Sequence, residues 1–152
     1  AIIFTSGSTG PAKGVLYRHR NFDAQVELIQ KQYHIQPGEI DVPCFALFGL
    51  FNAAMGGTTV IPQMDFSRPA ACDPRLIVEE AIGRHHATQS FASPAVWDKV
   101  GRYCEAEQIQ FKDLRRVLSA GAPVRGDILE RMMRVLPPDA EMHTPYGATE
   151  AL

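Results

Sequence analysis

The sequence has no hydrophobic run as long as the roughly 20 residues that a membrane-spanning helix needs. It also has no cluster of basic residues, since its 15 lysines and arginines are scattered and its net charge is -2. A protein that binds nucleic acid would carry such a cluster on one face. With 45% hydrophobic residues and a mean hydropathy of -0.11, the composition is typical of a soluble globular domain.

Cysteine is scarce and irregularly placed. The three cysteines, Cys44, Cys72 and Cys104, are odd in number and widely spaced, which favours reduced thiols in a cytoplasmic protein over disulfides. The histidines lack metal-ligand spacing. His85 and His86 are adjacent, so on a helix their side chains would diverge by about 100°. We therefore predict a cytoplasmic location and no metal site built from histidine or cysteine.

The chain has the length of about one domain, at 152 residues. It starts without an initiator methionine and ends at Leu152 without a terminating pattern. We expect it to be an excerpt of a longer protein.

The beginning of the chain is its most informative stretch. Ala1 to Phe4 is typical of a short buried strand, and it runs into a loop that ends near Lys13. Hydroxyl side chains alternate there with glycines that let backbone N–H groups face an anion, and the lysine adds a positive charge. These residues are Thr5, Ser6, Gly7, Ser8, Thr9, Gly10, Lys13 and Gly14. The composition favours a polyphosphate ligand.

This loop differs from the P-loop of nucleoside triphosphatases. That motif has Ser or Thr directly after its Gly-Lys pair, whereas Lys13 lies between Ala12 and Gly14. Loops rich in glycine and hydroxyl groups are also often plain solvated connections, and the loop alone leaves that alternative open.

Beyond the loop, strand patterns alternate with amphipathic helix patterns. Helices are predicted near 22–33, within 47–57, from Pro74, from Pro94 and at 128–136. Strands are predicted at 14–17, 42–46, 58–62, 89–92, 116–119 and 142–144. This alternation indicates an α/β fold with a parallel sheet covered by helices.

In such sheets ligands bind beyond the carboxyl ends of the strands. Two loops of interest follow predicted strands. The first is Ala120-Gly121-Ala122-Pro123, and the second is Pro145-Tyr146-Gly147-Ala148-Thr149-Glu150. We expect these loops to line a site together with the first loop.

The string from Thr5 to Gly14 closely resembles the phosphate loop of the adenylate-forming superfamily, which holds acyl-CoA synthetases, adenylation domains of peptide synthetases and luciferases. The loops at 120–123 and 145–150 resemble the next two signatures of that family, in the same order. Three motifs in order are far more specific than one. The resemblance spans the whole chain and implies that residues 1–152 are part of the large N-terminal AMP-binding domain, with the C-terminal lid domain beyond them.

The resemblance implies how ATP is bound. Gly121, Ala122 and Pro123 would face the adenine, and the ring of Tyr146, followed by Gly147, would stack on its other face. Taken alone, the same residues would be typical of a tight turn and of a tyrosine at a strand end.

The resemblance also implies the catalytic residues. Lys13 would act on the phosphates, Thr149 would contact the α-phosphate, and Glu150 would help to hold Mg²⁺. ATP and Mg²⁺ are therefore the expected cofactors. A lone glutamate at such a position would otherwise be typical of a solvated or helix-capping residue.

The substrate pocket is expected at Phe45, Ala46 and Phe48, with Ser93 and Gly121 as further walls. Family members commonly have a Pro-x-Phe-His motif here, and Ala46 occupies the histidine position. The pocket end that receives the substrate carboxylate would therefore be larger and uncharged. With the stretches at 38–41 and 146–152, this chain looks most like the β-lactone synthetases of bacterial long-chain olefin biosynthesis.

The reaction implied is ATP-dependent activation of a carboxylic acid as an acyl-adenylate, with release of pyrophosphate. A long-chain 2-alkyl-3-hydroxy acid would then close to a β-lactone. The alternatives are a fatty acyl-CoA synthetase and a nucleotide-binding module without catalysis. The excerpt alone should be inactive, because the family's ribose-binding aspartate and lid-domain lysine lie beyond Leu152.

Overall fold

The chain forms a hairpin and a separate five-stranded sheet. The structure, a computed structural model, describes residues 1–5 and 10–149. The hairpin pairs β1 (Ile2–Phe4) with β2 (Gly14–Leu16) in antiparallel fashion. The larger sheet is parallel, in the order β4 (Thr58–Thr59), β3 (Ile40–Pro43), β5 (Gln89–Ala92), β6 (Arg116–Ser119) and β7 (Glu141–His143). The predicted α/β fold is confirmed.

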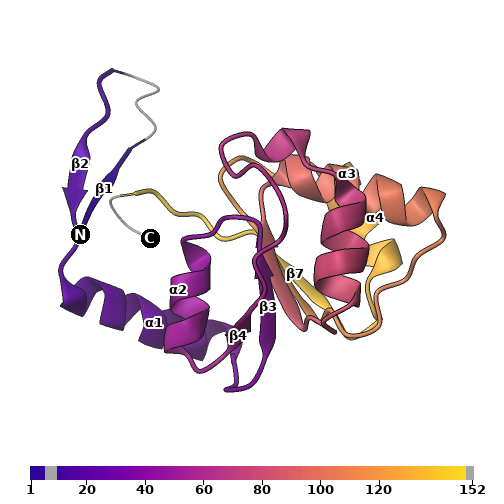
Figure 1. Cartoon of the computed structure of the whole chain (residues 1–152), viewed down its shortest axis with the longest axis horizontal. Coiled ribbons are helices and arrows are strands. Elements are labelled where there is room, and N and C mark those ends of the chain that lie inside the picture. The colour runs from indigo at the N-terminus through magenta and orange to yellow at the C-terminus, as the bar shows by residue number, and fades with distance from the viewer. Residues whose placement is uncertain (6–9, 150–152) are drawn as a thin grey trace.

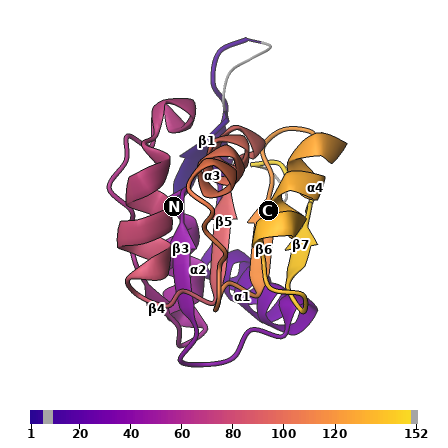
Figure 2. The same cartoon turned by 90° about the vertical axis from the view of Figure 1, so that its right-hand side faces the viewer.

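Helices cover both faces of the parallel sheet (Figure 1). On one face lies α2 (Phe48–Ala54), against which α1 (His19–Tyr33) packs. Figure 2 shows the other face, covered by the π-helical η2 (Leu76–Gly83), α3 (Pro94–Ala106) and α4 (Gly126–Val135). A short 3₁₀ helix, η1 (Pro69–Ala71), lies in the connection before η2.

The main core lies on the face covered by α3 and α4. Side chains alternate between the two faces along each strand. Val42, Ser90 and Val117 are aligned on neighbouring strands and are fully buried. Val42 and Val117 belong to the core cluster that also buries Trp97 and Met132. This cluster fixes the sheet from which the candidate loops emerge.

The opposite face carries a polar row beneath α2. The Nε2 of Gln89 donates to Asn52 Oδ1 at 3.0 Å, so a strand residue holds a helix residue. Nη1 of Arg116 donates to Gln89 Oε1 at 2.9 Å and to Glu39 Oε2 at 2.6 Å. Buried polar groups are costly unless they are hydrogen-bonded, and this row satisfies its members through one another.

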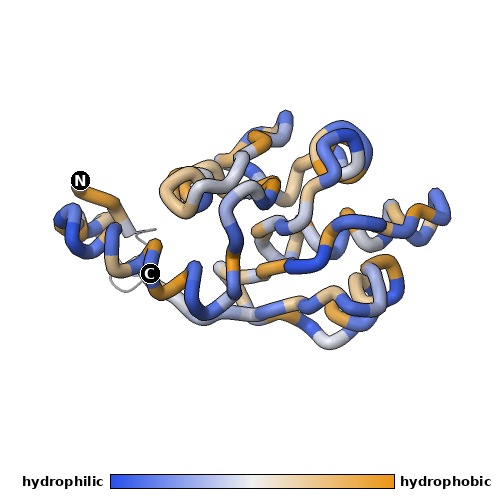
Figure 3. The backbone as a smooth tube through the Cα atoms, turned by 90° about the horizontal axis from the view of Figure 1, so that it is seen from below, coloured by the Kyte–Doolittle hydropathy of each residue, from blue (hydrophilic) through white to orange (hydrophobic). Residues whose placement is uncertain are grey.

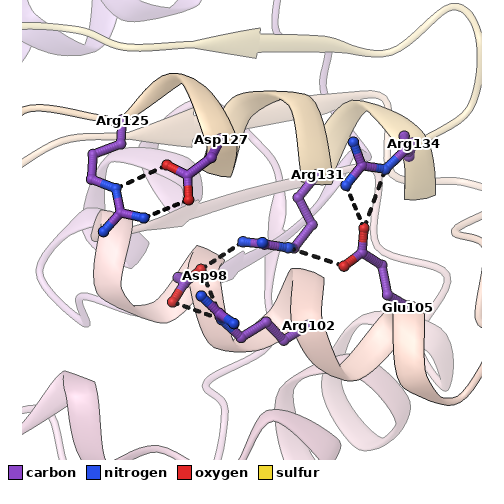
Figure 4. A network of polar contacts seen from close by, with 7 residues as sticks. All are labelled: Asp98, Arg102, Glu105, Arg125, Asp127, Arg131 and Arg134. Atoms are coloured by element: carbon purple, nitrogen blue, oxygen red, sulfur yellow. Dashed lines mark hydrogen bonds and ion pairs between the residues drawn. The ribbon is translucent and has the colours of Figure 1, made fainter.

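Ion pairs join α3 to α4 on the outer side of the sheet (Figure 4). Arg131, whose side chain is 15% exposed, contacts Asp98 at 2.7 Å and Glu105 at 3.0 Å, and Arg134 contacts Glu105 at 2.6 Å. Exposed pairs contribute little, but a shared, partly buried arginine holds two helices in one geometry. α3 follows the loop after β5, and α4 follows the loop after β6. By holding the two helices together, the network also helps to fix the relative positions of these two loops.

The prediction of a buried first strand was wrong. Ile2 is 61% exposed and Phe4 is 65% exposed. The hydrophobic start of the chain lies at the edge of the molecule in Figure 3. The hairpin stands apart from the parallel sheet, so the core of that sheet does not cover its apolar side chains.

Some predicted boundaries were also wrong. β3 begins at Ile40 rather than at 42, and β4 ends at Thr59 rather than at 62. α1 begins at His19 rather than near 22, and Asn21 lies inside its first turn. There the Oδ1 of Asn21 accepts a hydrogen bond from the backbone N–H of Arg18 at 3.0 Å, so the asparagine still closes the helix start.

Candidate active site

The predicted phosphate loop connects the two strands of the hairpin. The backbone N–H of Thr5 donates to the Lys13 carbonyl at 3.0 Å, and the N–H of Lys13 donates to Thr5 Oγ1 at 3.0 Å. These bonds close the base of the loop and leave the exposed lysine at its end. A Cβ on Gly14 would lie 2.8 Å from Ile2 Cγ2, so a larger residue there would force the Ile2 side chain to shift. The loop residues Ser6, Gly7, Ser8 and Thr9 lie outside the described part of the chain.

Tyr17 joins this hairpin to the last predicted motif. Its backbone N–H donates to the Ala1 carbonyl at 2.9 Å, which extends the hairpin by one pair. Its phenol Oη donates to the backbone carbonyl of Thr149 at 2.6 Å, across 132 positions of sequence. In Figure 1 the chain after β7 returns to the side of the hairpin. Glu150, the predicted magnesium ligand, lies outside the described residues.

The predicted adenine loop and Ser93 lie at the ends of neighbouring strands. β5 and β6 are paired up to Ala92 and Ser119, so the loops that follow these strands begin side by side. Gly121 has φ of +93°, in the left-handed region that favours glycine, and the loop 121–123 is exposed. The hydroxyl of Ser93 is buried and has no hydrogen-bond partner among the described residues. These residues meet at the carboxyl edge of the sheet, where ligands of such folds bind.

Tyr146 belongs to the segment that follows β7, the strand next to β6. The residue is 98% exposed, so its ring is open to a planar ligand. Gly147 is exposed as well, and Thr149 is half-buried at the Tyr17 contact. The two predicted adenine-binding segments therefore leave neighbouring strands at the same edge of the sheet.

The predicted substrate residues surround the start of α2. Phe48 stacks on Phe91 of β5 with ring centroids 4.1 Å apart, and Phe45 lies 5.6 Å from Phe48. Ala46 is exposed, and its carbonyl accepts a hydrogen bond from Gly49 N–H at 3.1 Å. Phe91 was not among the predicted site residues, although its place in a predicted strand just before Ser93 was a usable signal.

An apolar cleft of about 200 Å³ lies between the hairpin, α1 and α2. Its apolar lining includes Ile3, Phe22, Leu47, Leu50 and Phe51. The stacked rings of Phe22 and Phe51, 4.8 Å apart, belong to the small core between α1 and α2. This cleft was not predicted from the sequence, because its walls come from three elements separated along the chain.

Neither a reactive cysteine nor a protein-built metal cluster is found near the predicted substrate residues within the described part of the chain. Cys44 lies at the end of β3, just before Phe45, and burial raises the pKa of its thiol to about 12. It therefore stays protonated and is a poor nucleophile. Among residues 1–5 and 10–149, no group of three or more His, Cys, Asp and Glu side chains is placed to hold a metal ion.

Comparison with known proteins gives the family. The model of the family described as AMP-binding enzyme matches residues 1–152. The chain belongs to this family of AMP-binding enzymes. In the part that the structure describes, none of the helices is long and apolar enough to span a membrane.

Two similar relatives are both named olefin beta-lactone synthetase. That of Xanthomonas campestris is 47% identical over all 152 residues of this chain, which cover 26% of the relative. That of Stenotrophomonas maltophilia is 45% identical, again over the whole chain and over 27% of the relative. The chain thus spans about a quarter of the length of these curated relatives.

A solved structure confirms the fold of this AMP-binding segment. A long-chain-fatty-acid-CoA ligase from Archaeoglobus fulgidus superposes with a TM-score of 0.81 at 22% identity, covering 98% of this chain and 31% of that one. At this identity the likeness concerns the fold alone.

Proposed function

We propose that residues 1–152 form part of the N-terminal adenylation domain of an enzyme that activates a carboxylic acid with ATP. A C-terminal lid domain would follow in the full-length protein, by which we mean the chain extended to the length of its relatives. The observation that carries the proposal is the convergence of the motifs. Tyr17 ties the hairpin to Thr149 at 2.6 Å, while the loops of Gly121 and Tyr146 leave neighbouring strands at one edge of the sheet.

The first step would be attack of a substrate carboxylate oxygen on the α-phosphorus of ATP. The bond from this phosphorus to the oxygen that bridges to the β-phosphate breaks, and pyrophosphate leaves. Lys13 would stabilise the leaving group, and Thr149 would contact the α-phosphate. When bound, Mg²⁺ would neutralise charge on the phosphates, held in part by Glu150. Tyr146 and the loop 121–123 would hold the adenine between them.

The acyl part would lie near α2. The apolar cleft and the cluster of Phe45, Phe48 and Phe91 flank α2, so an alkyl chain entering there loses contact with water. The small, exposed Ala46 between Phe45 and Phe48 would leave room for an acid that carries a branch beside its carboxylate. This supports a 2-alkyl-3-hydroxy acid as the substrate, in line with the names of the two similar relatives.

The second step would need no other substrate. The 3-hydroxyl oxygen attacks the acyl carbon of the adenylate, its proton passes to solvent, and the bond from this carbon to the AMP oxygen breaks. A positioned intramolecular nucleophile gains up to about 7–11 kcal/mol, which offsets the strain of a four-membered β-lactone ring. We also propose a cytoplasmic location, since the three cysteines are buried free thiols.

Mass spectrometry of the full-length protein tests this function. The protein is incubated with ATP, Mg²⁺ and a 2-alkyl-3-hydroxy acid, with and without coenzyme A. We expect a β-lactone, AMP and pyrophosphate in both reactions. A thioester formed only with coenzyme A would instead identify an acyl-CoA synthetase, and bound ATP without any product would identify a binding module.

A further inference from the structure

Tyr17 contacts three parts of the candidate site, which are the hairpin, the apolar cleft and Thr149. Its backbone exchanges hydrogen bonds with Ala1, at 2.9 Å in each direction, so the residue belongs to the hairpin. The residue also lines the apolar cleft between the hairpin, α1 and α2. Its hydroxyl donates to the carbonyl of Thr149.

The phenol is suited to holding a backbone at a fixed distance. The ring is rigid and has only two side-chain torsions, so ordering it costs little entropy for the hydrogen bond gained. This bond is part-buried and 2.6 Å long, and its acceptor is a main-chain oxygen whose position sets that of the Thr149 side chain. Lys13 and Tyr17 flank β2 and are four residues apart, about 13 Å along an extended strand. β2 therefore connects Lys13, at the end of the loop, with Tyr17, whose hydroxyl contacts Thr149 at the other end of the strand.

We propose that Tyr17 is a positioning residue that holds Thr149 against the α-phosphate and also forms a wall of the apolar cleft, where the acyl chain would lie. The inference rests on the proposed function, because it assigns those roles to Thr149 and to the cleft. It goes beyond that function in predicting that the tyrosine hydroxyl and the tyrosine ring act on different kinetic constants. The hydroxyl affects the rate of adenylation, whereas the ring affects binding of the acid.

Two substitutions separate these contributions in the full-length protein. Tyr17→Phe removes only the hydroxyl, and we expect kcat for acid-dependent exchange of pyrophosphate into ATP to fall about 2- to 10-fold, with an unchanged KM for the acid. Tyr17→Leu also removes the ring, so the KM for a long-chain acid should rise as well. Tyr103→Phe is the matched control, since the Tyr103 hydroxyl donates to Glu79 on the other side of the parallel sheet.

Amide hydrogen exchange provides a readout that does not depend on turnover. In Tyr17→Phe, a peptide containing residues 145–149 should exchange faster than in the wild type, while peptides from α3 and α4 should not change. If Tyr17→Phe had the wild-type kcat and also the wild-type rate of amide hydrogen exchange at 145–149, the inference would be overturned and the proposed function would stay intact. Absence of pyrophosphate exchange in the wild type would overturn the proposed function. A raised KM for the acid in Tyr17→Phe would also contradict the assignment, because the ring is still present.

Discussion

Asn52 of α2 donates from its Nδ2 to Thr59 Oγ1 of β4 at 3.0 Å. The threonine hydroxyl in turn donates to the carbonyl of Gly49 at 3.2 Å, so one side chain contacts α2 at two points. A Cβ on Gly49 would lie 2.9 Å from Thr59 Cγ2, which shows how closely the helix approaches the strand. This contact sets the height of α2, and with it the position of Phe48, above the sheet.

Thr59→Val should destabilise the fold more than Thr59→Ser. Valine keeps the shape but leaves Asn52, which is 1% exposed, without its acceptor, at a cost of about 1–3 kcal/mol in the free energy of unfolding. Serine keeps the hydroxyl and loses only a methyl group, about 1 kcal/mol. Urea unfolding of both variants checks this. Equal losses would show that packing, rather than the hydrogen bonds, holds α2.

The regular parts of the fold could be predicted because their signals are local. The strands 89–92 and 116–119 were predicted at their exact bounds, since turn residues flank short runs that begin and end clearly. Met133 is 45% exposed although its neighbour Met132 is fully buried, because adjacent helix residues point about 100° apart. The first strand was predicted as buried because its residues are apolar, and sequence alone does not show which surface covers them.

The candidate site could be predicted only in part. The loops at 121–123 and 145–149 were placed correctly at strand ends, because in a parallel sheet these ends lie at one edge. The contact of Tyr17 with Thr149 joins residues 132 positions apart, and no periodicity encodes it. The cleft was missed for the same reason.

Asp41 should make stability depend on pH. Burial raises the pKa of this carboxyl group to about 7, while the positive charge of Arg116 lowers it and the negative charge of Glu39 raises it. An acid with a raised pKa in the folded state binds its proton more tightly there. Its contribution to stability is therefore complete below about pH 4 and is lost as the pH rises to about 7.

Asp41→Asn should abolish the loss of folding stability that the wild type shows as the pH rises. At pH 8 we expect the variant to be more stable than the wild type by about 1–4 kcal/mol, and the difference should shrink toward pH 4. Urea unfolding at several pH values measures it, with the exposed Asp139→Asn as control. A wild-type stability that stays flat between pH 4 and 7 would contradict the buried-acid account.

Lys13 should act in catalysis rather than in folding. Its backbone holds the hairpin through Thr5, but its side chain is exposed, so Lys13→Ala leaves no cavity and should change the free energy of unfolding by less than about 0.5 kcal/mol. Pyrophosphate release by the full-length protein should nevertheless slow about 100-fold or more, as when one preorganised charge contact is removed. Lys31→Ala, on the exposed side of α1, is the control. Normal release with a large loss of stability would reverse this assignment.

Ala46→His should lower activity with branched substrates more than activity with unbranched ones. Ala46 is exposed at the start of α2, where only its carbonyl is used in the helix, so a larger side chain is compatible with folding. An imidazole between Phe45 and Phe48 would fill the space proposed for the 2-alkyl branch. Crowding costs about 1–3 kcal/mol, so kcat/KM for a 2-alkyl-3-hydroxy acid should fall about 10- to 100-fold, and that for the unbranched 3-hydroxy acid much less. Pyrophosphate release with both acids measures the ratio, and Ala54→His, at the far end of the same helix, should leave it unchanged. An equal loss for the two acids would mean that the branch lies elsewhere, because only a branch that contacts residue 46 can make the substitution selective.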